Sequence, residues 1–385
     1  MSPQTDGPDD GRLFEIFFDL VRLGSEPGNE GEVCAYIREF CTALGFAVHE
    51  DAAAAATGSE CGNLVVRVPA GTFSSLPPVI LCAHMDTVKP SDHVIPFDLG
   101  DRFVSMSDTV LGADCKAGIA SILATVEKLI EAGGPYRALE LIFTVQEEPG
   151  LVGVQSLDME LVDGKWGVVL DGSGPVGEIV IEAPSQEKLK FTIKGRAAHA
   201  GVEPEKGANA IVCAARGIAG IPTGRLDEST TSNVGLISGG VAVNVVPESA
   251  QVECEIRSMS DERLEAERER LLGSFEKASQ EMGCELVVEA SRSFDHFKLD
   301  AAATPVHYLA RALKESGFEP ALAMSGGGSD ANVLNSRGLQ IAVMNIGLVN
   351  AHTKEEYILK DELTGVARTV TSLAYMAGEE GSVRA

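Results

Sequence analysis

Two histidines and four acidic residues occur where apolar segments of strand length end or where a helix begins. They are His84, Asp114, Glu147, Glu148, Asp171 and His352. In open α/β sheets, ligands bind outside the carboxyl ends of the strands. Two histidines with several carboxylates suit a pair of borderline divalent ions such as zinc, cobalt or manganese. The residue types therefore predict a centre for two divalent metal ions.

The number of these groups also leaves room for an acid–base residue. One bridging carboxylate and two further ligands per ion would use five of the six groups and leave one as general base. The pair Glu147–Glu148 fits this division, because adjacent residues of an extended chain point to opposite sides. Asp86, two residues after His84, could hold the far imidazole nitrogen of that histidine. Gly112 and Gly118 flank Asp114 and allow the backbone to approach another group closely.

Each of these residues also has an ordinary structural explanation. His84 could be satisfied by a neighbouring Asp in a turn, and Asp114 could cap a helix. The glutamate pair could be a solvated strand end, Asp171 part of a simple turn before glycine, and His352 a surface residue. Their joint occurrence at four strand ends and one helix start favours the metal centre.

Strands and helices alternate around these residues. The apolar patterns predict strands at 63–68, 78–84, 138–145, 166–171 and 339–345. They predict helices at 11–22, 30–44, 116–132, 303–316, 329–336 and 360–377. This order indicates an α/β fold with a mostly parallel catalytic sheet covered by helices on both faces.

A different pattern occupies the middle of the chain. A half-exposed strand is predicted at 187–194, and further strands at 231–238, 250–257 and 284–290, with helices at 207–219 and 261–281. This indicates a small α+β unit with one open sheet face. We therefore expect a catalytic domain made of residues 1–183 and 298–385, and an inserted domain at 184–297.

The composition excludes several classes of protein. Hydrophobic residues make up 44% of the 385 residues, which excludes a disordered chain, and the net charge of −26 opposes binding to nucleic acid or to an anionic membrane. The eight cysteines form no CxxC pair and indicate reduced thiols. We expect a cytoplasmic protein with no membrane span and no nucleic-acid partner.

Several short motifs occur in a familiar order between residues 84 and 352: HMDTV, LGADCKAG, TVQEEPG, LDG, GRAAHAG, NVVPE and a late histidine. In this order they resemble the co-catalytic zinc metallopeptidases that include peptidase T, glutamate carboxypeptidase and succinyl-diaminopimelate desuccinylase. The run SGGGSDANVLNSRGL, followed by NIGLVNAHTKEEY, most resembles the peptidase T branch, the tripeptide aminopeptidases. The resemblance covers nearly the whole chain.

The resemblance implies a role for each candidate residue. His84 and Asp171 would hold one zinc ion, Glu148 and His352 the other, and Asp114 would bridge them. By the same resemblance, Glu147 would be the general base and acid, and Asp86 would orient His84. The family usually has Asp or Asn where this chain has Cys115. A thiol beside the bridge would be open to oxidation or to inhibition by metals.

The inserted domain would be the lid and dimerisation domain of this family. His199 resembles the lid histidine that stabilises the tetrahedral oxyanion, and it could act across a dimer. Asn244 and Arg257 match lid positions that contact the substrate, although Arg257 could equally pair with a surface glutamate. The glycine turn that contains Gly327 and Gly328 would cradle the peptide backbone.

We therefore expect a di-zinc exopeptidase that acts on short peptides, most similar to tripeptide aminopeptidases, and that forms a homodimer through its lid. An N-acyl amino acid deacylase or a carboxypeptidase would use the same metal motifs. Two alternatives belong to other classes: a non-catalytic binding protein on a peptidase fold, and a nucleotide-binding α/β protein. The nucleotide-binding alternative lacks support, because no GxGxxG or GxxxxGK[ST] motif follows a strand.

Overall fold

The computed structural model describes residues 7–71 and 76–379, which divide into two compact units. The first unit comprises the residues up to Glu182, Lys298–Ser325, and the residues from Ser329 onward. The second comprises Ala183–Phe297 together with Gly326–Gly328. The second unit is therefore an insertion in the chain of the first. Three glycines from the later part of the sequence group with this insertion.

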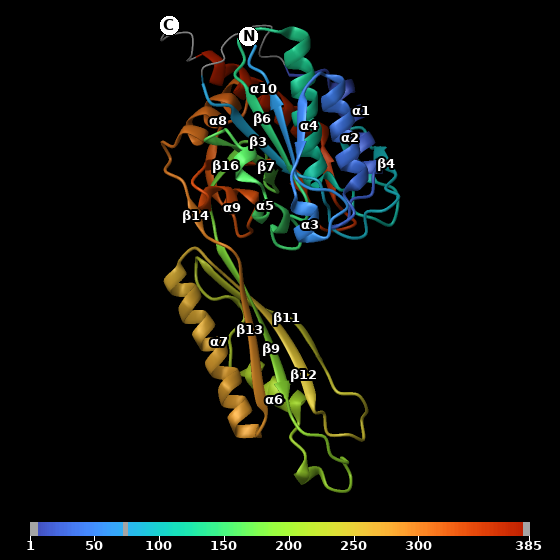
Figure 1. Ribbon diagram of the computed structural model, residues 1–385, viewed down its shortest axis with the longest axis vertical. Helices are drawn as coiled ribbons and strands as arrows, with labels where there is room; N and C mark the ends of the chain where they lie inside the picture. Colours follow the sequence, from blue (N-terminus) through green and yellow to red (C-terminus); the bar gives the residue numbers. More distant parts are fainter. Residues whose placement is uncertain (1–6, 72–75, 380–385) are drawn as a thin grey trace. The chain divides into compact units, whose positions relative to one another are not determined.

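A nine-stranded sheet, counted over the described residues, forms the centre of the first unit (Figure 1). Its path is β1 (Ala47–Glu50), β2 (Leu64–Val68), β6 (Leu139–Thr144), β3 (Val79–His84), β7 (Trp166–Gly172), β16 (Gln340–Asn345), β8 (Glu178–Ala183) and β14 (Phe297–Lys298), with β15 (Ala321–Met324) beside β8. The central strands β6, β3, β7 and β16 run parallel. Strands β1 and β2 pair antiparallel with their neighbours, and β8 pairs antiparallel with β16 and parallel with β15. The carboxyl ends of the four parallel strands therefore lie at one edge.

Helices α4 (Ala113–Ala132) and α8 (Thr304–Glu315) cover one face of this sheet. Trp166 of β7 stacks on Tyr308 of α8, with ring centroids 5.0 Å apart. Leu170 points to the same face of β7 as Trp166 and lies against Gly118 of α4. A Cβ atom at Gly118 would be 2.5 Å from the Leu170 carbonyl oxygen, so this contact requires glycine.

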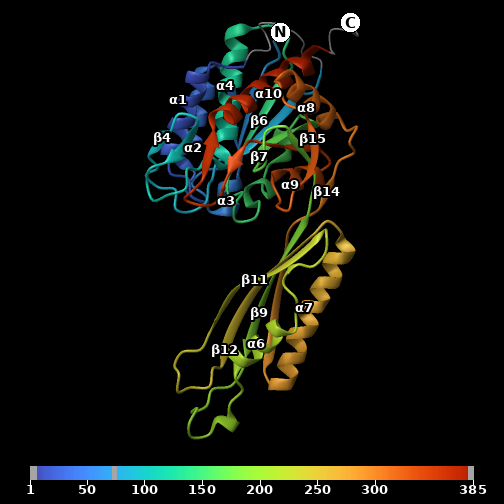
Figure 2. The same ribbon diagram turned by 180° about the vertical axis from the view of Figure 1, so that it is seen from behind.

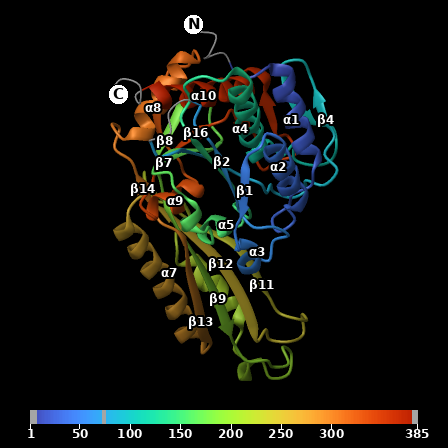
Figure 3. The ribbon, with the colours of Figure 1, turned by 45° about the horizontal axis from the view of Figure 1, so that its top comes forward.

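The short helices α5 (Val152–Gln155) and α9 (Asp330–Ser336) lie side by side on the opposite face (Figure 3). Cys82 of β3 donates to Asp330 of α9, and Cys82 pairs in register with Val169 of β7. Val169 is next to Leu170, so the two side chains point to opposite faces of the sheet. The sheet is thus covered on both faces, which confirms the predicted fold class.

Helices α1 (Asp10–Arg22), α2 (Gly31–Ala43) and α10 (Lys360–Glu379) pack around α4. The helix α1 buries the five residues whose spacing predicted it, which are Leu13, Ile16, Phe17, Leu20 and Val21. The side chain of Asp9 caps its first turn. A short helix α3 (Ala53–Thr57) precedes β2. Within the two described ranges, no helix is both long and apolar enough to cross a membrane.

A small antiparallel sheet of short strands also belongs to the first unit. Its order is β17 (Leu348–Val349), β18 (Tyr357–Leu359), β5 (Arg102–Ser105) and β4 (Pro96–Asp98). These strands were not predicted, because two to four residues give too short a periodic pattern. The turn between β17 and β18 carries His352.

The second unit contains the antiparallel sheet β10 (Gly224–Arg225), β11 (Thr230–Gly239), β12 (Ser249–Ser258), β9 (Ser185–Lys194) and β13 (Glu285–Phe294). The helices α6 (Ala210–Ala219) and α7 (Asp261–Met282) pack on one face of it (Figure 2). The stacked rings of Phe191 and Phe275, with centroids 4.0 Å apart, lie in the core between sheet and helices.

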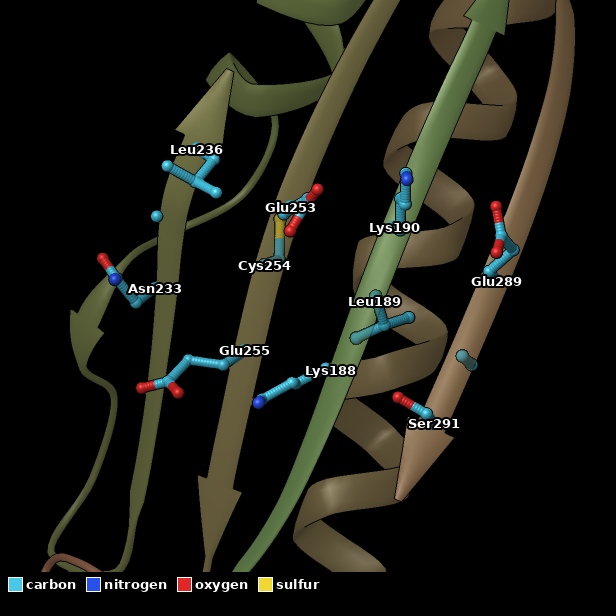
Figure 4. A pocket seen from close by; sticks show the side chains of 12 residues that line it. Lys188, Leu189, Lys190, Asn233, Leu236, Glu253, Cys254, Glu255, Glu289 and Ser291 are labelled. Carbon is cyan, nitrogen blue, oxygen red and sulfur yellow. The ribbon is translucent and has the colours of Figure 1, made fainter. Parts of the chain in front are cut away.

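The other face of this second sheet is open. Charged and polar residues such as Lys188, Lys190, Glu253 and Glu289 line a shallow hollow on it (Figure 4). They alternate along the strands with core residues such as Phe191. The alternation of polar and apolar residues in 187–194 thus reflects one buried and one exposed face, as predicted.

Candidate metal centre

The six predicted residues come together at the carboxyl edge of the central strands. His84 is the last residue of β3, Asp171 lies near the end of β7, and Glu147 and Glu148 follow β6. Two groups of side chains each have ligand atoms within 4.8 Å of one another. The first contains His84, Asp114, Cys115 and Asp171, and the second contains Asp114, Glu148 and His352.

The carboxylate of Asp114 belongs to both groups. Its Oδ1 is 3.1 Å from His84 Nε2, and its Oδ2 is 3.2 Å from His352 Nε2. Asp114 and Cys115 have non-helical backbone angles, so the regular part of α4 begins after them. The chain therefore presents Asp114 between two imidazoles from distant segments, which suits a carboxylate shared by two ions.

The remaining side chains complete one group on each side of Asp114. His84 Nε2 is 3.5 Å from Asp171 Oδ1, and His352 Nε2 is 3.2 Å from Glu148 Oε2. The other oxygen of Glu148, Oε1, is buried and has no hydrogen-bond partner within the described part of the chain. Two groups of nitrogen and oxygen donors with an unsatisfied buried oxygen fit a pair of divalent cations.

Burial of so many carboxylates perturbs their protonation. Burial raises the pKa of Glu148 and Asp171 above the usual range, and raises the pKa of Glu147 well above it. Burial alone would do the same for Asp114, but hydrogen bonds from His352 and His84 hold its pKa well below the usual value. Hydrogen bonds with Asp114 and Glu148 raise the pKa of His352 to about 10. A cluster of buried carboxylates is stabilised by positive charge, which bound cations supply.

Glu147 differs from its neighbour Glu148 in surroundings. It belongs to neither group of ligand atoms, and its side chain is almost fully buried. Besides burial, the negative charge of Asp171 raises its pKa. A carboxylate beside a candidate metal centre, free of ligand contacts and biased toward holding a proton, has the properties of a general base.

Asp86 contacts both His84 and the main chain of the pair Glu147–Glu148. Its main-chain oxygen lies 2.8 Å from His84 Nδ1, whereas its nearest carboxylate oxygen is 3.4 Å away. The carboxylate instead accepts the main-chain N–H groups of Glu147 and Glu148, at 2.9 and 3.1 Å. Asp86 thus holds the His84 ring mainly through its backbone and ties β3 to the glutamate pair through its side chain.

Cys115 is buried beside the first group of ligands. Its Sγ donates to the main-chain oxygen of Leu170 at 2.6 Å, and burial raises the pKa of the thiol well above its usual value. A protonated thiol engaged with a carbonyl is a poor metal ligand, because binding requires the thiolate. The departure from the family pattern therefore leaves the donors of the two groups in place.

The predicted lid residues all lie in the second unit. His199 and Asn244 are both exposed. Their segments are adjacent, since the Ala200 N–H donates to the Asn244 main-chain oxygen at 3.0 Å. Arg257 forms an ion pair with Glu255, with Nε and Oε1 3.2 Å apart. It also donates to the main-chain oxygen of Gly326 at 3.4 Å, which places it next to the glycine turn.

The glycine turn leads into α9. A Cβ atom at Gly328 would overlap the ring of Phe294, so the position is closed to larger residues. Gly327 lies between Gly326 and Gly328, in the part of the turn that groups with the second unit. Ser329 then caps α9, and its main-chain N–H binds the Asn332 side chain.

The sequence did not predict the burial of three charged residues near the centre, although Asp330 was expected at a helix start and does begin α9. Asp330 accepts from the Thr144 hydroxyl at 2.5 Å, Lys116 donates to the Leu23 main-chain oxygen at 2.7 Å, and Glu356 accepts two main-chain N–H groups. Each is at most 2% exposed. A charged residue beside a strand or helix end carries no sequence signal of burial. The sequence did offer one indication that Glu356 could have a role at the site, because Glu355 and Glu356 form an adjacent glutamate pair like that at 147–148.

Comparisons with known proteins agree with this geometry. Residues 63–181 match Peptidase family M28, and residues 187–282 match the Peptidase dimerisation domain of the M20 peptidases. The uncharacterized protein YqjE of Bacillus subtilis is 36% identical, over 94% of this chain and 97% of that protein. Peptidase T of Escherichia fergusonii is 25% identical, over 84% and 88%.

Two solved structures resemble the whole chain. One is aminopeptidase PepT from Bacillus cereus, with 39% identity, a TM-score of 0.86, and coverage of 96% of this chain and 99% of that one. The other is a tripeptidase from Staphylococcus aureus, with 32% identity, a TM-score of 0.91, and coverage of 97% and 99%. These likenesses extend over both units and confirm the resemblance deduced from the motifs. The chain belongs to the M20 family of metallopeptidases, within its peptidase T branch.

Proposed function

We propose that this protein is a two-metal aminopeptidase that removes the N-terminal residue of tripeptides. The observation that carries the proposal is the position of Asp114, whose two carboxylate oxygens lie 3.1 and 3.2 Å from two imidazoles. The likeness to an aminopeptidase and a tripeptidase over nearly the whole chain supports the substrate class.

The donors around Asp114 fit zinc. In this proposal His84 and Asp171 would hold one ion, Glu148 and His352 would hold the other, and Asp114 would be a ligand of both. Imidazole nitrogens and carboxylate oxygens are ligands that zinc accepts in catalytic sites, and cobalt or manganese can occupy similar sites. Two such ions, when bound, would supply the positive charge that polarises a scissile carbonyl and lowers the pKa of a water molecule.

Glu147 is proposed as the residue that moves the proton. Its carboxylate takes a proton from the attacking water as the oxygen of that water bonds to the carbonyl carbon. It then delivers the proton to the amide nitrogen as the carbon–nitrogen bond breaks, which releases an amine. The raised pKa of Glu147, caused by burial and by Asp171, suits a group that must hold this proton between the two steps.

The exposed lid residues are proposed to bind the substrate. His199 donates a hydrogen bond to the developing oxyanion, and Asn244 binds a carbonyl of the peptide. Arg257 binds the substrate carboxylate through the N–H groups that Glu255 and Gly326 leave available. The backbone of Gly327 and Gly328 contacts the peptide main chain. The adjacency of His199 and Asn244 supports a shared role.

We also propose that the protein is a cytoplasmic homodimer, joined through the inserted domain. Residues 187–282 match a dimerisation domain. Val202, Val241 and Val243, in the loops that carry His199 and Asn244, are 73%, 90% and 104% exposed. Exposed apolar side chains that are grouped on two neighbouring loops, as these are, are typical of an interface. Replacing Val241 and Val243 by Asp should yield a monomer in light scattering, whereas a monomeric wild type would refute the dimer.

The substrate class is tested with the tripeptide Leu-Gly-Gly and its N-acetylated form. Metal-free protein is reloaded with zinc or cobalt, and the products are identified by mass spectrometry. An aminopeptidase releases Leu and Gly-Gly from the free peptide and leaves the acetylated peptide intact. A carboxypeptidase releases C-terminal Gly from both peptides, and a deacylase releases acetate. Either of these outcomes, or cleavage without metal, would overturn the proposal.

A further inference from the structure

Glu356 is a buried carboxylate that contacts the segment carrying Asp114. Its residue surface is 2% exposed. Oε2 accepts the main-chain N–H of Gly112 at 2.8 Å, and Oε1 accepts the main-chain N–H of Asp114 at 3.1 Å. Both oxygens of the side chain are therefore used to fix the backbone that presents Asp114 to the centre.

The backbone of Glu356 belongs to the turn that carries His352. In this turn the Thr353 N–H donates to the Asn350 main-chain oxygen at 3.2 Å, and the Glu356 N–H donates to the Thr353 main-chain oxygen at 3.1 Å. The next residue, Tyr357, begins β18, which pairs with β5. Glu356 thus closes the His352 turn with its backbone and reaches the Asp114 segment with its side chain.

His352 and Asp114 depend on such a link, because they are 238 residues apart in sequence and their facing atoms are 3.2 Å apart. An ion pair between Lys354 and Asp108, with Nζ and Oδ1 2.7 Å apart, joins the same two segments. Its side chains are 48% and 90% exposed, and exposed ion pairs contribute little to stability because water screens their charges. The buried hydrogen bonds of Glu356 are the stronger connection.

We propose that Glu356 is a positioning residue that holds Asp114 and His352 in the geometry required by the second metal ion, the one bound by Glu148 and His352. The inference rests on the two-metal centre proposed above. A carboxylate is needed because both partners are N–H donors, and a glutamine would offer one oxygen and turn an N–H group toward the other donor. The Glu356→Gln variant therefore loses one hydrogen bond and buries an unsatisfied donor.

Zinc titration of the metal-free protein against a chromophoric chelator tests this role. The wild type should bind two ions, and Glu356→Gln should weaken one of them by about 10- to 100-fold, as loss of a group that orients ligands typically does. Glu355→Gln is the matched control, because it makes the same chemical change at the exposed neighbour and should leave both affinities unchanged. Glu356→Asp keeps both acceptor oxygens and should bind the weakened ion more tightly than Glu356→Gln.

The affected ion is identified in a second background. His352→Ala removes a ligand of the second ion only. The first ion uses Asp114 but not His352, so adding Glu356→Gln to this variant should weaken the remaining ion by less than Glu356→Gln alone weakens the second ion. An equal loss in both backgrounds would overturn the inference, as would two ions bound by Glu356→Gln with wild-type affinity. A wild type that binds fewer than two ions would instead overturn the proposed two-metal centre. Circular dichroism of each metal-free variant separates these effects from failure to fold.

Discussion

Asp86 and Glu147 are joined through the main chain of Glu147, whose N–H donates to Asp86 Oδ1 at 2.9 Å. The other oxygen of Asp86 accepts the Glu148 N–H. One fully buried carboxylate thus fixes the backbone of the proposed base and of a proposed ligand. Because both bonds are made to the main chain, the two glutamate side chains remain free to face the centre.

Removing this carboxylate should lower activity without unfolding the protein. In Asp86→Asn one of the two N–H groups loses its acceptor, which shifts the glutamate pair, and we expect kcat to fall by about 10- to 100-fold. Steady-state kinetics on a tripeptide measures the effect. Asp101→Asn, at an exposed position, is the control and should behave as wild type. A kcat of Asp86→Asn equal to that of the wild type would show that the two hydrogen bonds do not matter for catalysis.

Replacing Glu147 should separate turnover from metal binding. Since Glu147 lies outside both groups of ligand atoms, Glu147→Ala should retain two ions per chain but lose about 100- to 10,000-fold in kcat. Glu148→Ala should lose one ion. Metal content by mass spectrometry and kcat are measured on the same samples. Loss of both ions from Glu147→Ala would mean that the base has been placed wrongly.

Asp114 should control both ions at once. Its carboxylate lies between the two groups, so Asp114→Ala should lower the metal content from two ions to none and abolish activity. Asp108→Ala, in the same segment but exposed, should keep both ions. Full activity of Asp114→Ala would rule out a bridging role.

The buried carboxyl of Asp330 should make the stability of the metal-free protein depend on pH. Burial raises its pKa to about 7, whereas the unfolded chain has an ordinary aspartate pKa of about 3.9. Between these values the unfolded state has lost a proton that the folded state keeps, so stability falls as pH rises, by up to about 1.4 kcal/mol per pH unit. Asn does not titrate at this position, so the pH dependence that comes from Asp330 is absent in Asp330→Asn. The urea midpoint of this variant should therefore fall less than that of the wild type between pH 4 and 7. Parallel pH profiles would contradict the shift.

The close approach of α4 to β7 should make Gly118 intolerant of a side chain. A Cβ atom there would be 2.5 Å from the Leu170 main-chain oxygen, so Gly118→Ala should destabilise the protein by about 1–3 kcal/mol. Gly273→Ala is the control, because a Cβ atom at that position would meet no neighbouring residue within 4 Å and alanine favours the helix by about 1 kcal/mol. Opposite shifts in thermal unfolding temperature are expected. Destabilisation by Gly273→Ala of the same size would point to a general glycine effect.

Much of the fold follows from periodicity in the sequence. The ends of long helices such as that predicted at 261–281 agree with the structure to within a residue or two. The apolar residues of such a helix recur over several turns and therefore indicate which face is buried. The strands β4, β5, β17 and β18 escaped prediction, although they position the His352 turn. Pairing of such short strands is decided by contacts between distant segments, which a single sequence does not display.

The candidate site divides in the same way. Candidate metal ligands at strand ends, such as His84 and Asp171, could be predicted from the sequence, because the carboxyl ends of parallel strands lie at the same edge of the sheet. Glu356 and Asp330 could not, because their role depends on which main-chain N–H groups and hydroxyls the fold brings near them. The division of Asp86 between its main-chain oxygen and its carboxylate was likewise visible only in the folded chain.

The strand β16 lies between β7 and β8 in the sheet, although β7 and β8 come from before the insertion and β16 from after it. During synthesis, all strands of the second unit have emerged by residue 294, so its sheet can be completed early. In the first unit, one edge of β7 stays unpaired until β16, at residues 340–345, has been synthesised. An unpaired strand edge in the middle of an apolar sheet is a site for aggregation and chaperone binding. The order of these segments in the sequence thus makes the inserted unit the first part of the nascent chain that can fold. The nine-stranded sheet of the first unit is the last part that can be completed.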